Sequence, residues 1–90
     1  MSDLHQLKGL GPKSQAMLLQ VGILSVEQFM ATDPFAIYAQ LHVTIPNLSL
    51  NMLYAMIGAQ EDVHWQLIKA ERKTEILLRL DDMGLAPRRK

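Results

Sequence analysis

The sequence contains no cysteine. This absence excludes disulfides, thiol catalysis and thiolate metal sites, and it is typical of a protein from a reducing compartment. No apolar run is long enough to span a bilayer, and the acidic start lacks the basic segment and apolar run of a secretory signal. We therefore expect a cytoplasmic protein without a membrane-spanning segment.

An excess of charge of either sign is also missing. Nine basic and nine acidic residues give a formal net charge of zero, so the chain lacks the positive field of a dedicated nucleic-acid binder. Any contact with DNA must then be local and sensitive to salt. The 90 residues, 49% of them hydrophobic, suffice for one core but leave no room for a deep cleft between domains.

The residue patterns of enzymes are absent as well. The three histidines lie in different segments, and no two are four residues apart as in a helical zinc site. Ser14 and Ser49 lack the context of a nucleophile elbow, and Ser49 is better explained as a helix cap. We predict no catalytic residue, no metal site and no cofactor.

The most informative segment that is present is a glycine hairpin near the start, Leu7-Lys8-Gly9-Leu10-Gly11-Pro12-Lys13. Glycines let a backbone approach a ligand closely, proline opens a helix, and the free amides of a helix start favour an anion. One interpretation is therefore a phosphate site that includes Lys13. The alternative is a purely structural helix–helix turn in which Leu10 plugs into the core.

Helix signals recur along almost the whole chain. The caps, prolines and glycines predict helices over residues 2–7 and 12–22, helices beginning after Ser25 and Asp33, and helices over about residues 50–60 and 63–80. The β-branched run at residues 43–45 and the following turn signal predict a connector over residues 42–48. The fold class is therefore all-α, a compact single domain of five or six short helices.

The helix over residues 50–60 is nearly all apolar or small, so we expect it to be the most buried one. Gly58 inside it indicates a close helix crossing. Glu61 and Asp62 are expected to begin the last helix, because negative charge is favourable at a helix start. Glu75 and Arg79 are four residues apart, a spacing that predicts an ion pair on the solvated face of that helix.

Two residue types leave a choice between core and ligand contact. Trp65 can anchor the core, the commoner role of a tryptophan at the start of an amphipathic helix, or stack on a base. The methionines can fill the core or line an adaptable partner surface. Four of them have apolar neighbours and are predicted to fill the core: Met17, Met30, Met52 and Met56.

Several of these segments together resemble a known family. The hairpin with Ser14, Leu18, Gly22-Ile23 and Ser25-Val26, followed by Leu53-Tyr54-Ala55-Met56-Ile57-Gly58-Ala59 and His64-Trp65, is similar to the C-terminal domain of the TfoX/Sxy family of bacterial competence regulators. The resemblance covers about residues 4–78. The hairpin alone fits any helix-hairpin-helix protein, whereas the later segments at this distance are more specific.

This resemblance implies an all-helical domain with a helix-hairpin-helix-like element, in a family linked to DNA transformation and competence regulation. In helix-hairpin-helix proteins the hairpin glycines and a following lysine hold a DNA phosphate. The corresponding positions here are Gly9, Gly11 and Lys13, with Lys8 nearby. Full-length family members also have an N-terminal domain, so the chain is either a stand-alone version or a fragment of a longer regulator.

We therefore expect a helical TfoX C-terminal-like domain over residues 1–80 and a flexible basic tail over residues 81–90. The leading hypothesis is a non-enzymatic module that contacts the DNA backbone weakly, without reading sequence, in a competence or transcription-regulation context. The alternative is a protein-interaction or dimerisation module in which the hairpin is purely structural. The basic residues gathered on one face would favour DNA, and their scattering would favour a protein partner.

Overall fold

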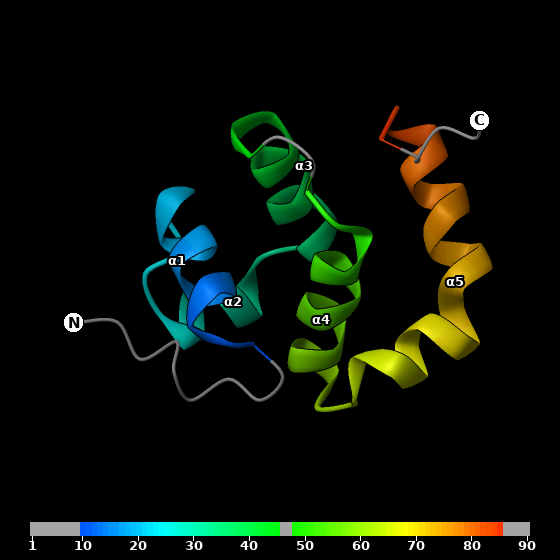
Figure 1. Cartoon of the computed structure of the whole chain (residues 1–90), viewed down its shortest axis with the longest axis horizontal. Coiled ribbons are helices and arrows are strands. Elements are labelled where there is room, and N and C mark those ends of the chain that lie inside the picture. The colour runs from blue at the N-terminus through cyan, green and yellow to red at the C-terminus, as the bar shows by residue number, and fades with distance from the viewer. Residues whose placement is uncertain (1–9, 46–47, 86–90) are drawn as a thin grey trace.

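The described part of the chain in the computed structural model, residues 10–45 and 48–85, consists of five α-helices and contains no strand (Figure 1). The helices are α1 (Pro12–Gln20), α2 (Val26–Ala31), α3 (Pro34–Thr44), α4 (Leu50–Glu61) and α5 (Trp65–Asp82). The all-α prediction is confirmed. The expected helix over residues 2–7 and the end of the tail, residues 86–90, lie outside the described residues.

Three of the predicted helix caps are confirmed. The Ser25 hydroxyl accepts a hydrogen bond from the Gln28 amide, Asp33 caps α3 through the Phe35 amide, and Ser49 caps α4. Gln28 also ties the preceding turn, since its side chain accepts from the Leu24 amide and donates to the Gly22 carbonyl. Capping therefore accounts for where α2, α3 and α4 begin.

Helix α4 is the most buried helix, as its composition predicts. It lies between α5 on one side and the group of α1, α2 and α3 on the other (Figure 1). Six of its residues are buried: Met52, Leu53, Tyr54, Met56, Ile57 and Gly58. They meet Leu18, Phe29 and Leu41 from the first three helices and Ile76 and Leu80 from α5 in one core. A single core of this kind fixes the position of every helix relative to α4.

Two expected helix boundaries are wrong. The connector expected over residues 42–48 begins later, because α3 continues through Val43 and Thr44, where the Thr44 hydroxyl donates to the Gln40 carbonyl in the last turn. Glu61 ends α4 instead of beginning the last helix, and Asp62 takes a left-handed conformation with φ 57°. Helix α5 begins at Trp65, and the Nδ1 atom of His64 accepts the Gln66 amide as its cap.

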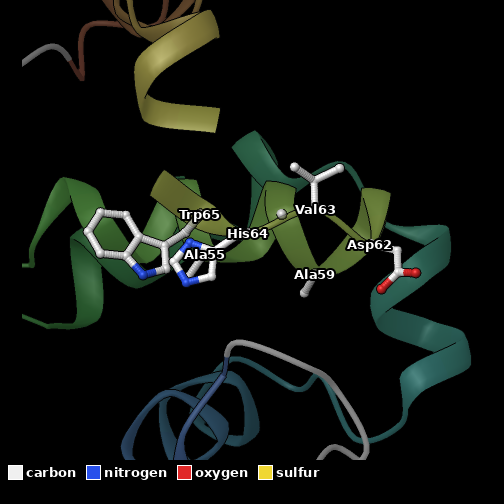
Figure 2. Close-up of a pocket in the computed structure, with 7 residues that line it drawn as sticks. Ala55, Ala59, Asp62, Val63, His64 and Trp65 are labelled. Carbon is white, nitrogen blue, oxygen red and sulfur yellow. The ribbon is translucent and has the colours of Figure 1, made fainter. Parts of the chain in front are cut away.

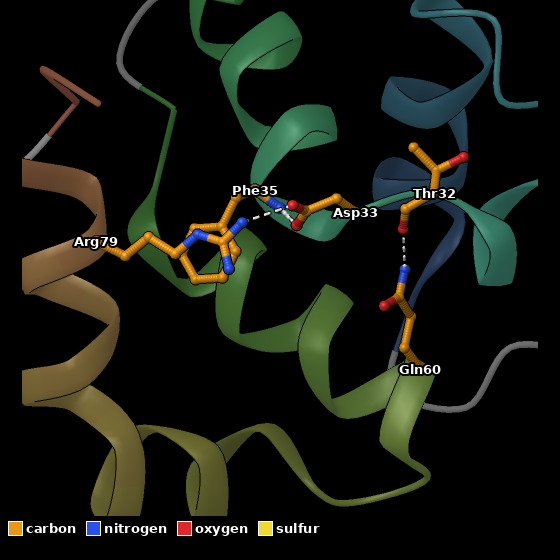
Figure 3. A network of polar contacts seen from close by, with 5 residues as sticks. All are labelled: Thr32, Asp33, Phe35, Gln60 and Arg79. Atoms are coloured by element: carbon orange, nitrogen blue, oxygen red, sulfur yellow. Dashed lines mark hydrogen bonds and ion pairs between the residues drawn. The ribbon is translucent and has the colours of Figure 1, made fainter. Parts of the chain in front are cut away.

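The expected pair of Glu75 with Arg79 is also wrong. Arg79 donates instead to Asp33, at 2.6 Å, and its guanidinium lies 4.3 Å from the centre of the Phe35 ring (Figure 3). Glu75 pairs with Arg72, which also binds Glu61. Both arginines thus connect α5 to earlier segments, Arg72 to Glu61 at the end of α4 and Arg79 to Asp33 at the N-cap of α3.

The methionine prediction holds in part. Met52 and Met56 are buried, and Met17 packs partly buried against the core. Met30 does not fill the core, since 47% of its surface is exposed on the short helix α2. That helix points Phe29 into the core, which turns the next residue outward.

No helix in the described part of the chain is both long and apolar enough to cross a membrane. Within residues 10–45 and 48–85 no three histidine, cysteine or acidic side chains gather as a metal site would require.

Candidate functional site

The start of α1 is the part of the predicted site that the structure describes. Gly11 is the N-cap residue, and it has no side chain to cap the helix. Pro12 occupies the first helical position and carries no amide hydrogen. The next two amides, of Lys13 and Ser14, have no acceptor among the described residues. Within the described residues, the helix start therefore presents two backbone donors without an acceptor.

Leu10 shows that the hairpin also has a structural role. Its side chain is buried at 5% exposure, and its carbonyl accepts a hydrogen bond from the Gln15 side chain. The prediction that Leu10 plugs into the core is confirmed. Its burial fixes the direction in which α1 leaves the hairpin, so the structural and functional interpretations of this segment are compatible.

Lys13 has an exposed side chain in the first turn of α1. No described carboxylate pairs with it, whereas Arg72 and Arg79 are both held in ion pairs. The hydrogen bond from Arg72 to Glu61 raises the pKa of that guanidinium above its ordinary value. Among the described residues, Lys13 is therefore a positive charge without an ion-pair partner. Of the other predicted site residues, Lys8 and Gly9 lie outside the described residues.

The backbone does not require glycine at position 11. Its φ is −78° and its ψ is 177°, which is ordinary extended backbone. A Cβ atom placed there would meet nothing within 4 Å. The positive φ that would make Gly11→Val damage the fold is absent. The positive-φ glycines of the described chain are Gly22, which ends α1, and Gly84, which follows α5.

A cavity of about 260 Å³ lies beside the start of α1, and we call it the Trp65 cavity. The first turn of α4 and the indole of Trp65 complete its walls, so three helices contribute to it. Its lining residues are Lys13, Ser14, Met17, Leu48, Ser49, Asn51, Met52, Ala55 and Trp65. Lys13 therefore shares one cavity with a half-buried aromatic ring that is distant in sequence.

A second cavity, of about 370 Å³, adjoins the first and shares Ala55 and Trp65 with it; we call it the His64 cavity. Figure 2 shows His64 and Trp65 at one end and Asp62 at the other. The rings of His64 and Trp65 are stacked, with centroids 5.9 Å apart and planes 28° apart. The indole is thus held from one side by the residue before it.

Gly58 explains how α5 begins so close to α4. A Cβ atom on Gly58 would overlap the Val63 carbonyl oxygen and come within 3.4 Å of the Trp65 amide nitrogen. The backbone does approach Gly58 closely, but at the Val63 carbonyl oxygen of the link and at the first residue of α5, so the contact is a tight turn and not the predicted helix crossing. The missing side chain lets the chain turn tightly and places Trp65 against α4.

Sequence reasoning did not bring Trp65 together with Lys13, nor did it include Ser14 or Asn51 in the site. The sequence pattern marks Ser14 as part of the family resemblance and Ser49 as a helix cap, and neither role indicates a ligand contact. The sequence signal available for Ser14 and Asn51 is that each lies in the first turn of a predicted helix, Ser14 in α1 and Asn51 in α4. Their convergence depends on how the tertiary fold brings α1, α4 and the start of α5 to one cavity, which no local pattern specifies.

A comparison with models of protein families identifies the family of this chain. The model of the TfoX C-terminal domain matches residues 1–80. The chain belongs to the TfoX C-terminal domain family. The resemblance drawn from the hairpin and the later segments is therefore confirmed, and this family is competence-related and regulatory and is not known as enzymatic. Neither a search of curated proteins nor a search of solved structures gave a match.

Proposed function

We propose that this TfoX C-terminal domain is a non-enzymatic module that contacts the DNA backbone without reading sequence, in a competence or transcription-regulation context. The observation that carries the proposal is the open start of α1. Two backbone amides that have no acceptor among the described residues lie beside an exposed lysine that no described carboxylate neutralises. Lys8 and Gly9, which precede Gly11 in the sequence, are the other residues that we assign to the proposed phosphate site.

The chemistry of this helix start suits a phosphate. Backbone amides at a helix N-terminus donate to anionic oxygens, and the helix dipole favours negative charge there. A lysine in the first turn is poorly placed for the dipole but well placed for the phosphate. Such a contact positions the domain on DNA and carries no sequence information.

The affinity of the contact should be low. The net charge of zero provides no long-range attraction to DNA, and one lysine releases few counterions from the phosphate backbone. Binding should therefore weaken as the salt concentration rises, and it should be similar for duplexes of unrelated sequence.

Fluorescence anisotropy with two labelled duplexes of unrelated sequence tests the proposal. We expect equal binding to both at low salt, weaker binding at higher salt, and loss of binding in Lys13→Glu. Lys73→Glu is the matched control, because Lys73 is also exposed, has no ion pair with a described residue and gives the same net charge when reversed. Unchanged affinity in Lys13→Glu, or no binding at low salt, would contradict the proposal.

A second candidate is a protein-interaction module, and exposed apolar side chains favour it. Val43, Leu78 and Leu24 are 87%, 63% and 58% exposed. Single exposed apolar residues are common on protein surfaces, so they support an interface only if they act together. Sedimentation velocity over a range of protein concentrations tests self-association, and a constant monomer mass would exclude a second copy as the partner.

A further inference from the structure

The Trp65 cavity is not used by the proposed phosphate contact, although Lys13 belongs to both. We propose that this cavity receives one unpaired base of a single-stranded DNA segment whose phosphate is held at the start of α1. The inference rests on the proposed function and deepens it, because it names the form of DNA that the site fits. It is carried by the cavity, its aromatic wall and the single cation at its rim.

The size of the cavity fits one planar group. Its volume of about 260 Å³ is just below the roughly 300–1,000 Å³ of sites for drug-sized ligands. Met17, Met52 and Ala55 supply apolar surface, and the indole of Trp65 supplies a flat one. Bases stack on aromatic side chains without regard to sequence, because every base has a π-face.

Polar groups at the cavity can meet the edge of a base. The Ser14 hydroxyl and the Asn51 carboxamide line it, and neither makes a side-chain hydrogen bond with a described residue. A hydroxyl can donate and accept, and a carboxamide offers two donors and an acceptor. These groups accommodate the donors and acceptors of different bases, which agrees with binding that does not depend on sequence.

The charges on the two sides of Trp65 determine where the backbone of the bound strand lies. Lys13 lies on one side, at the rim of the Trp65 cavity, and Asp62 lines the His64 cavity on the other side. A phosphate is attracted to the first and repelled by the second. The backbone of the strand should therefore pass at Lys13, while its neutral base occupies the space against the indole.

This arrangement favours unpaired DNA over duplex. A base in a duplex is stacked inside the helix and must be extruded before it can enter a protein cavity. A base in a single strand is already available, so both the phosphate contact and the stacking contact form together. Duplex DNA should make the phosphate contact alone.

Trp65 is the only tryptophan of the chain, so its fluorescence reports on the cavity directly. We would titrate the unaltered protein with oligothymidylate and with a duplex of the same length. The proposal predicts quenching of Trp65 emission by oligothymidylate and roughly ten-fold tighter binding of it than of the duplex. Ala55→Leu, which adds bulk at a residue that lines both cavities, should lose the quenching and lower single-strand affinity to the duplex level.

Ala36→Leu is the control for this variant, because Ala36 is an exposed helical alanine outside the cavity lining. Equal affinity for both DNA forms with unchanged Trp65 emission would overturn this inference and leave the phosphate contact standing. Binding to neither form would overturn the proposed function as well. Emission that changes with protein concentration in the absence of DNA would assign the cavity to a second copy of the chain and overturn the inference.

Discussion

At the scale of single residues, Gly11 and Gly22 stand at the two ends of α1 for different reasons. Gly22 has φ +84°, a conformation that strains any other common residue, and it allows the chain to leave the helix. Gly11 has an ordinary φ and open space where a side chain would lie. The fold requires glycine at position 22. Glycine at position 11 instead keeps the amides of the helix start accessible.

Replacing each glycine by serine separates these roles. Gly11→Ser supplies the missing N-cap side chain, so we expect the free energy of unfolding to rise by a few tenths of a kcal/mol while DNA binding weakens, because the hydroxyl occupies the amides. Gly22→Ser should lower the free energy of unfolding by about 1 kcal/mol or more. Urea denaturation of both variants measures this difference, and a destabilised Gly11→Ser would show that position 11 needs glycine after all.

Among the described residues, Tyr54 carries the one buried side-chain polar atom without a hydrogen-bond partner. It is 1% exposed, and its hydroxyl has no hydrogen-bond partner among the described residues. Burial raises the pKa of Tyr54 above the ordinary value, and burial together with the nearby Tyr54 raises the pKa of Tyr38. The folded domain therefore holds both phenols in the neutral form.

Tyr54→Phe should be more stable than the unaltered protein by about 1–2 kcal/mol near neutral pH, because it removes the unpaired buried hydroxyl. The raised pKa also predicts alkaline sensitivity. The stability that comes from the raised tyrosine pKa values is fully present below the unfolded-state pKa of about 10. It is lost as the pH rises further, because the unfolded chain releases the phenolic proton at a lower pH than the folded chain. Thermal melts from pH 8 to 11 test this, and an identical alkaline loss in Tyr54→Phe and the unaltered protein would contradict it.

At the scale of elements, side chains far apart in sequence connect the helices. Asp33 caps α3 through one carboxylate oxygen and accepts from Arg79 of α5 through the other (Figure 3). The side chain of Gln60 in α4 donates to the carbonyls of Phe29 and Thr32 at the end of α2. Each contact holds the link between α2 and α3 against a later helix.

The two functions of Asp33 can be measured separately. Asp33→Asn keeps a capping oxygen but loses the ion pair, and we expect a loss below about 1 kcal/mol because both side chains are half exposed. Asp33→Ala loses the cap as well and should cost about 1 kcal/mol more. Urea denaturation, with Arg79→Gln as the partner in a double-mutant cycle, gives both values; equal losses in the two Asp33 variants would exclude a capping role.

The elements also show where sequence reasoning succeeded. Ser25, Asp33 and Ser49 are capping residues whose local hydrogen bonds do not depend on the rest of the fold, so their helix starts could be predicted. The start of α5 could not, because His64 is an unusual cap and Glu61 binds Arg72 of α5 instead of joining that helix. Local charge preferences do not reveal such a tertiary partner.

At the scale of the whole molecule, the arrangement of the helices decides the candidate site. The hairpin could be recognised from its glycines, proline and lysine, and family membership follows from the match over residues 1–80. The Trp65 cavity could not be predicted, because it needs α1, α4 and α5 to converge. Sequence motifs thus suggest the proposed phosphate contact, and tertiary packing adds the aromatic wall beside the start of α1.

The central claim is that the start of α1 holds a DNA phosphate, and an amide-resolved NMR titration tests it most directly. The ¹⁵N-labelled domain would be titrated with a short duplex at low salt, and the shift of every backbone amide followed. The account predicts the largest shifts at the amides of Gly11, Lys13 and Ser14 and their loss in Lys13→Glu. Shifts centred on the exposed apolar residues Leu24, Val43 and Leu78, or no shifts at the start of α1, would contradict it.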